Sequence, residues 1–216
     1  MDIILNNEES RVLGCLIEKE MTTPDLYPLT LNALINACNQ KTNRDPVVSY
    51  DEETVLQALE QLVSKDLVWE SRLSRAIKYE ERFTHNNQMV NKEASVICVL
   101  LLRGAQTIGE IKSRTERMCN FTSLDDVTKT IESTALLNYV TKLPRQPGQK
   151  ESRFRHTMLP DTIDNETYQT AENENELNHI SVDNERLENL ELKVEQIYNE
   201  LNALKTSFIE FKKQFE

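Results

Sequence analysis

Two segments of the chain share one arrangement of polar and apolar positions. NEESRVLGCLIEKE begins at Asn7, and NKEASVICVLLLRG begins at Asn91. Each starts with polar residues and continues as a dense apolar stripe with helical spacing, which predicts a buried first helix. The likeness between the two segments indicates a weak internal repeat.

The repeat extends into a later pair of segments. DEETVLQALEQLVSKDLVWE, from Asp51, resembles LDDVTKTIESTALLNYVTKL, from Leu124. In each, apolar positions with helical spacing give way to a stretch typical of a β-strand, so a helix running into a strand is predicted. Both helices are preceded by residues with the spacing of a capping box, Ser49-x-x-Glu52 and Ser123-x-x-Asp126.

A middle helix and a closing strand complete each copy. LTLNALINACNQ and TIGEIKSRTERM predict the middle helices, and Thr107-x-x-Glu110 has the residues of a capping box. After a polar turn, second strands are predicted over residues 76–83 and 151–156. Helix, helix, helix, strand, turn, strand is the order of a winged helix-turn-helix. We therefore predict a mainly α fold with small β-hairpins (α+β), formed by tandem winged helix-turn-helix domains over residues 1–88 and 89–160.

The residues after Pro160 differ from this pattern. Residues 161–185 are rich in Asn and Glu and nearly without large apolar residues, which predicts an acidic disordered linker. Over residues 186–216, apolar residues recur in alternating steps of three and four, which predicts a coiled-coil helix and a homodimer. The alternative is a helix that folds back on the winged-helix domains. The seam consists of Leu187, Leu190, Val194, Ile197, Leu201, Leu204, Phe208, Phe211 and Phe215.

Charge is distributed unevenly along the chain, whose formal net charge is −11. Residues 1–88 carry −6, residues 89–160 carry +4 and residues 161–216 carry −9. No apolar run is long enough to span a bilayer, and the first residues lack the pattern of a signal peptide, so we expect a cytoplasmic protein that does not enter membranes. The four cysteines form no CxxC pair, so neither a zinc site nor a disulfide framework is indicated.

A long stretch of the first copy is similar to a known family. TTPDLYPLTLNALINACNQKTNRDPV, residues 22–47, resembles the YceH family of uncharacterised bacterial proteins. LRGAQTIGEIKSRTERM and LPRQPGQKESR resemble the same family's second-domain signature. The resemblance covers about residues 8–160 and implies a tandem winged-helix fold. It implies no established activity, substrate or catalytic residue.

Catalytic and metal chemistry has little support in the sequence. His85, His156 and His179 lie at predicted strand ends or in the linker, with no nucleophile or carboxylate at a helical or motif spacing that would complete a triad or a metal site. The four glycines are isolated, so no phosphate-binding loop is indicated. We therefore expect a protein that is not an enzyme and needs no cofactor.

One polar run suggests a partner-recognition loop. Arg44 could hold a carboxylate or phosphate of a partner with two parallel hydrogen bonds. The alternative is a helix C-terminus whose amides and basic residues satisfy the last carbonyl groups. The run consists of Asn39, Gln40, Lys41, Asn43 and Arg44.

Basic residues of the second copy suggest contact with DNA phosphates. Asp51 and Asp125, at the starts of the third helices, argue against insertion of those helices into a major groove, because carboxylates would face phosphates. The basic hairpin could equally be an ordinary solvated wing, or could dock on acidic parts of the chain. Two hypotheses remain: a DNA-associated regulator that uses its second domain, and a protein–protein adaptor. The basic residues are Arg145, Lys150, Arg153 and Arg155 in the wing, and Arg114 and Arg117, three positions apart, could extend the patch.

Overall fold

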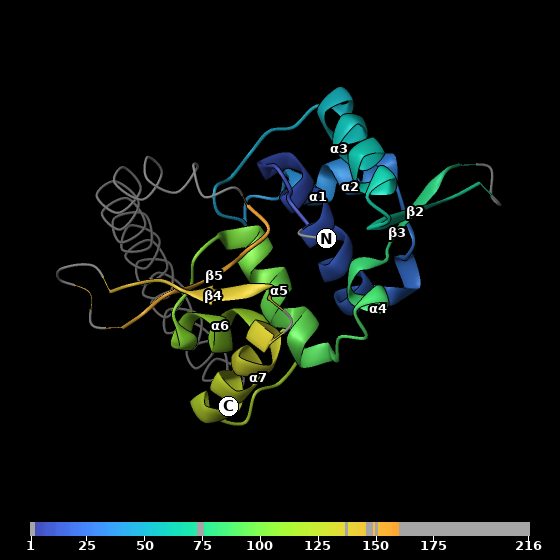
Figure 1. Ribbon diagram of the computed structural model, residues 1–216. Coiled ribbons are helices and arrows are strands. Elements are labelled where there is room, and N and C mark those ends of the chain that lie inside the picture. The colour runs from blue at the N-terminus through green and yellow to red at the C-terminus, as the bar shows by residue number, and fades with distance from the viewer. Residues whose placement is uncertain (1–2, 73–75, 137, 146–148, 150, 160–216) are drawn as a thin grey trace, which may run out of the picture. The chain divides into compact units, whose positions relative to one another are not determined.

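The computed structural model describes residues 3–72, 76–136, 138–145, 149 and 151–159. These residues belong to one compact unit and form a mixed α+β fold with two small antiparallel sheets (Figure 1). None of the described helices is long and apolar enough to span a membrane. The predicted α+β class is confirmed at this level.

The first half contains four of the α-helices and the larger sheet. In chain order its elements are α1 (Asn7–Thr22), the 3-10 helix η1 (Pro24–Leu26), β1 (Leu29–Thr30), α2 (Leu31–Cys38), α3 (Glu52–Ser64), β2 (Val68–Ser71), β3 (Lys78–Glu81) and α4 (Phe83–Asn86). The sheet has the order β1-β3-β2, with Leu29 opposite Tyr79 and Trp69 opposite Glu80. Alternation along β3 buries Tyr79 and Glu81 and leaves Lys78 and Glu80 partly exposed.

The second half contains three helices followed by two antiparallel strands, which is the order of α1, α2, α3, β2 and β3 in the first half. Its elements are α5 (Asn91–Arg103), α6 (Ile108–Thr115), α7 (Leu124–Leu136), β4 (Val140–Lys142) and β5 (Phe154–His156). Strands β4 and β5 pair antiparallel, with Val140 opposite His156. Gln106, which precedes α6, forms an isolated antiparallel bridge with Phe154 of β5. In the first half, β1 precedes α2 and pairs with β3 in the same way. The internal repeat in the sequence thus has a counterpart in strand pairing.

Helices α1 and α5 form the centre of the core. Ten consecutive residues of each, Glu9–Glu18 and Glu93–Leu102, are buried, as expected for helices covered on every side. The two helices approach closely at Gly14, because the thiol of Cys98 donates to the Gly14 carbonyl over 3.4 Å. A Cβ atom at Gly14 would lie 2.9 Å from the Leu102 side chain. The absent side chain of Gly14 therefore permits this packing, and the predicted buried first helices are confirmed.

Contacts outside the two central helices also join the halves. The amide of Asp45 donates to the Leu102 carbonyl over 3.0 Å. The rings of Phe83 and Tyr139 meet edge to face, with 5.0 Å between their centroids. The amide of Leu5 donates to the Met158 carbonyl over 2.7 Å, which ties the beginning of the described chain to its end. Apolar residues of both halves therefore share one core cluster.

Helix starts agree with the capping predictions in part. The Thr107 hydroxyl caps α6 by accepting from the amide of Glu110, and the Glu110 carboxylate accepts in return from the amide of Thr107. Ser123 accepts from the amide of Asp126. The proposed cap at Ser49 is wrong, because α3 begins at Glu52 and Asp51 accepts from the amide of Thr54 over 2.9 Å. Asp is a strong N-cap residue and its charge favours the helix N-terminus, so it competes successfully with the earlier serine.

Candidate anion-binding face

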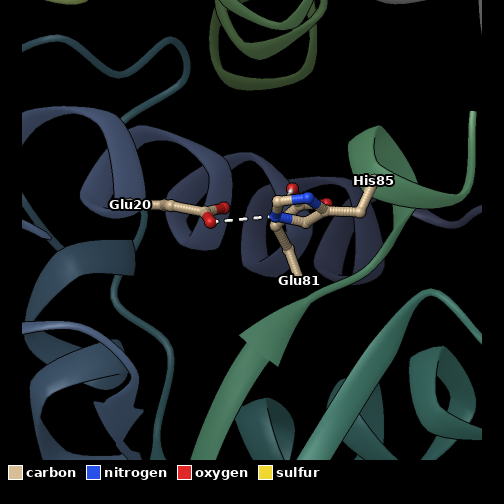
Figure 2. A group of neighbouring side chains, drawn as sticks. All are labelled: Glu20, Glu81 and His85. Atoms are coloured by element: carbon tan, nitrogen blue, oxygen red, sulfur yellow. Dashed lines mark hydrogen bonds and ion pairs between the residues drawn. The ribbon is translucent and has the colours of Figure 1, made fainter. Parts of the chain in front are cut away.

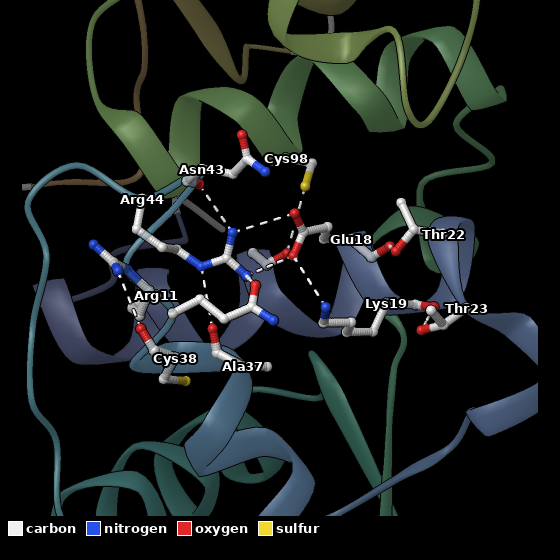
Figure 3. A network of polar contacts seen from close by, with 12 residues as sticks. Arg11, Glu18, Lys19, Thr22, Thr23, Ala37, Cys38, Asn43, Arg44 and Cys98 are labelled. Atoms are coloured by element: carbon white, nitrogen blue, oxygen red, sulfur yellow. Dashed lines mark hydrogen bonds and ion pairs between the residues drawn. The ribbon is translucent and has the colours of Figure 1, made fainter. Parts of the chain in front are cut away.

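Arg44 is an internal residue that connects three parts of the first half (Figure 3). Its side chain has no exposed area and pairs with both carboxylate oxygens of Glu18, at 3.2 and 2.5 Å. It also donates to the carbonyl groups of Ala37 and Asn43 and to the side chain of Gln40. Burial alone would lower the pKa of Arg44, but the bond to Glu18 raises it above its ordinary value. The guanidinium is therefore not available to a partner in this fold.

The other residues of the predicted recognition loop also take part in internal contacts. The side-chain amide of Asn39 exchanges two hydrogen bonds of 2.7 Å with the backbone of Tyr50. Asn43 has a positive φ of 60°, and its side-chain oxygen accepts from Arg103 over 2.9 Å. Lys41 is exposed. The contacts of Asn39 and Arg44 near the end of α2 agree with the alternative interpretation, a helix C-terminus satisfied by its own loop.

A small cleft that is open to solvent lies beside this loop, between α1, α5 and α6. Arg103, Arg114 and Arg117 contribute positive charge to its wall. Burial lowers the pKa of Arg103, and the neighbouring Arg114 lowers it further, as expected for two cations held close together. An anion in the cleft would reduce that repulsion. The lining residues are Glu18, Thr22, Asn43, Val99, Leu102, Arg103, Arg114, Arg117 and Met118.

Arg153 of the second wing reaches the same region through Glu110. One oxygen of the Glu110 carboxylate lies 3.5 Å from a nitrogen of Arg114, and the other lies 3.2 Å from a nitrogen of Arg153. Arg153 also donates to the Ala105 carbonyl over 3.0 Å. Two arginines that are far apart in sequence therefore lie on either side of one carboxylate. We call the surface formed by Arg103, Arg114, Arg117 and Arg153, together with the exposed Arg145 farther along the same wing, the arginine face.

The remaining basic residues of the prediction lie in different settings. Arg145 and Arg117 are exposed, and Arg155 is partly buried. Lys150 and the predicted dimerisation seam of residues 187–215 lie outside the described residues. The interpretation of Lys150 and of the seam therefore stays a prediction.

The third helices carry the opposite charge. The exposed face of α3 presents Glu52, Glu53 and Glu60, and that of α7 presents Asp125 and Glu132. Lys129 of α7 lies 2.8 Å from the carboxylate of Asp125, so its charge is balanced locally. These faces would repel a nucleic-acid backbone. A polyanion would be attracted to the arginine face instead.

One cluster of titratable groups was missed by the sequence analysis. The Nε2 atom of His85 lies 2.9 Å from Glu20 and 3.7 Å from Glu81, so His85 does have carboxylate partners (Figure 2). Burial raises the pKa of Glu81 to about 7. The hydrogen bond to Glu20 raises the pKa of His85. Glu81 and His85 have the four-residue spacing of a helical pair, which was a visible signal, but Glu20 is brought in only by folding.

Comparison with known proteins identifies relatives along the whole chain. Residues 5–149 match the family described as "Protein of unknown function, DUF480". A UPF0502 protein of Solibacter usitatus is 45% identical over 219 residues and covers 100% of both chains. A UPF0502 protein of Koribacter versatilis is 50% identical over 163 residues, 74% of this chain and 76% of its own. A UPF0502 protein of Saccharophagus degradans is 41% identical over 218 residues, 93% and 96% of the two chains.

Proposed function

The chain belongs to the DUF480 family of bacterial proteins, whose description assigns no function, and we propose that it is a cytoplasmic, non-enzymatic, DNA-associated protein built from tandem winged helices. The repeated order of helices and strands supports the winged-helix interpretation. In this proposal the second half contacts backbone phosphates, and the predicted C-terminal coiled coil pairs two chains. Because membership of this family assigns no activity to the chain, support for the proposed function has to come from the residues of the site.

The convergence of Arg114 and Arg153 on Glu110 is the observation that carries the proposal. It unites the wing and α6 in one surface, and Arg117 and Arg103 extend that surface into the cleft. Each guanidinium has five donors, so an arginine that already contacts one carboxylate can still bind a phosphate. Positive charge spread over such a face is the usual footprint of backbone contact.

The acidic residues of the third helices argue against insertion of those helices into the major groove of DNA. A standard winged helix inserts its third helix into the major groove, where base edges are read. Glu52 and Glu53 at the start of α3, and Asp125 at the start of α7, would then face phosphates. Contact through α6 and the second wing avoids that repulsion. Such contact reads sequence weakly, because phosphates carry no sequence information directly.

Fluorescence anisotropy of the full chain with a labelled mixed-sequence duplex tests this function. We expect binding at low salt that weakens steeply toward physiological salt. Replacing Arg117 and Arg145 by Ala should make the slope of log affinity against log salt less steep by roughly two, because each lost phosphate contact removes about 0.9. Replacing Lys41 and Arg72, two exposed cations of the first half, removes the same charge and serves as the control.

Each outcome of this experiment bears on the proposal. Binding that fails only in the Arg117 and Arg145 variant supports the arginine face. Equal weakening in both variants would refute the site, since it would indicate attraction by net charge alone. No binding by the wild-type chain even at low salt would refute DNA association.

A half-exposed tryptophan favours a second candidate function, that of a protein–protein adaptor. Trp69 is 49% exposed on the first wing, and the guanidinium of Arg82 lies 4.6 Å from the centre of its ring. Exposed Trp and Arg side chains are enriched among residues that dominate protein interfaces. A partner bound there should quench or shift Trp69 fluorescence, with little dependence on salt, and Trp69→Phe should remove that signal.

A further inference from the structure

We propose that Glu20, Glu81 and His85 form a binding site for a divalent transition-metal ion of the zinc class. The three side chains come from three separate elements: α1, the end of β3, and α4. Their ligand atoms all lie within 4.8 Å of one another (Figure 2). Neither the family description nor the names of the relatives refers to a metal.

The spacing of the ligand atoms suits tetrahedral coordination. Bonds of about 2.0 Å from Zn²⁺ to imidazole nitrogen and carboxylate oxygen place neighbouring ligand atoms roughly 3.3 Å apart. The Nε2 atom of His85 lies 2.9 Å from Glu20 Oε1 and 3.7 Å from Glu81 Oε1, one distance on each side of that value. Small rotations of the side chains would therefore bring all three atoms to bonding distance of one ion.

The charge of the cluster is unbalanced. Glu81 is only 2% exposed, and burying a carboxylate costs free energy unless it is paired. In the part of the chain that the structure describes, Glu20 and Glu81 form their ion pairs with His85 and with no Lys or Arg. The nearest cations along the chain are directed elsewhere: Lys19 pairs with Glu18, and Arg82 pairs with Glu80. A divalent cation would supply the missing positive charge.

The buried ligand is already held in position. The backbone amide of Thr84 donates to Glu81 Oε2 over 2.9 Å, and the Thr84 hydroxyl donates to Oε1. Such hydrogen bonds from outside the coordination shell orient a ligating carboxylate before the ion arrives. The His85 side chain is 64% exposed, so an ion can enter from solvent and keep a water molecule as its fourth ligand.

Ligand chemistry narrows the class of ion. One imidazole nitrogen with two carboxylate oxygens suits Zn²⁺ and its close relatives, whereas Mg²⁺ and Ca²⁺ prefer all-oxygen sites with six or more ligands. Because the three ligands belong to α1, β3 and α4, a bound ion would cross-link the wing of the first half to the C-terminal end of α1. We therefore expect binding to raise the stability of the fold.

Co²⁺ is the probe for the test, because a tetrahedral site gives it strong visible absorption bands that hexahydrated Co²⁺ lacks. The full chain, stripped of metal with a chelator, is titrated with Co²⁺ and then with Zn²⁺. We expect a tetrahedral spectrum with one ion per chain, displacement by Zn²⁺, and a higher Tm with Zn²⁺. His85→Ala and Glu20→Gln should each weaken affinity at least tenfold and remove the gain in Tm.

Glu80→Gln is the matched control, because it removes a neighbouring, partly exposed carboxylate of β3 that lies outside the cluster. Wild-type affinity in this control, with loss in both ligand variants, supports the site. Circular dichroism confirms that each variant is folded before titration. Absence of a tetrahedral spectrum in the wild-type chain, or an unchanged spectrum in His85→Ala, would overturn the proposal. Neither result depends on DNA, so this test is independent of the proposed function.

Discussion

Removal of Arg44 should be among the most damaging single substitutions in the first half. Arg44→Met keeps the apolar stem but deletes five hydrogen bonds, including two to Glu18. The Glu18 carboxylate, 7% exposed, is left with Lys19 at 3.9 Å as its remaining ion-pair partner. Breaking one side of a buried pair typically costs about 3–5 kcal/mol. For a domain of this size, about 4 kcal/mol corresponds to a fall in Tm of roughly 10 °C.

The free energy of unfolding, measured by urea titration and circular dichroism, checks this magnitude. Removing both charges with Arg44→Met and Glu18→Met should recover most of the loss, because no charge then remains buried without a partner. The matched control is Arg72→Met, which breaks an exposed pair with Glu70 and should cost less than about 1 kcal/mol.

Two results would refute this reasoning. A loss below about 1 kcal/mol in Arg44→Met would mean that Glu18 finds water or another cation at little cost. A double variant as unstable as the sum of the two single variants would mean that the two side chains act independently, despite their 2.5 Å contact.

Three further predictions follow from packing, protonation and the tail. Gly14→Val should destabilise the fold by about 1–3 kcal/mol in urea unfolding, because its side chain would collide with Leu102. Gly109→Ala, whose Cβ would lie at an ordinary contact distance of 4.0 Å from Thr107 Oγ1, should be neutral or stabilise by up to about 1 kcal/mol. Burial lowers the pKa of His156 from 6.5 to about 4, so its contribution to stability is present above pH 6.5 and is lost as pH falls toward 4. Between pH 7.5 and 5 the wild type should lose about 2 kcal/mol more than His156→Gln, and equal losses would contradict this. Deletion of residues 187–216 should convert a dimer into a monomer in light scattering; an unchanged mass would contradict the coiled-coil dimer.

The candidate site shows where inference from sequence was sufficient and where it was not. The basic character of the second half was visible in composition, and so was the acidic start of each third helix. The meeting of Arg114 and Arg153 at Glu110 was not, because Arg114 lies in α6 whereas Arg153 directly precedes β5. Only folding, which pairs Gln106 with Phe154, brings these two segments together. Arg44 looked like a surface residue because its polar neighbours in sequence suggested exposure.

The histidine cluster illustrates the same limit. Glu81 and His85 could have been paired from their spacing, but the third residue, Glu20, lies 65 positions before His85. A metal site assembled from distant segments leaves no motif in the sequence. Its ligands are recognised only when the coordinates show how their atoms are spaced.

The local elements and their order follow from short-range sequence patterns, because helix periodicity, capping residues and β-branched stretches act over a few neighbouring positions. The sequence therefore predicted the α+β class and the buried first helices around Gly14 and Cys98. Only the tertiary fold shows which segments contact each other: α1 packs against α5, Arg44 pairs with Glu18, and His85 pairs with Glu20. Those contacts depend on packing between residues far apart in the chain. Periodicity within one segment indicates that a face is buried and does not specify the face that covers it.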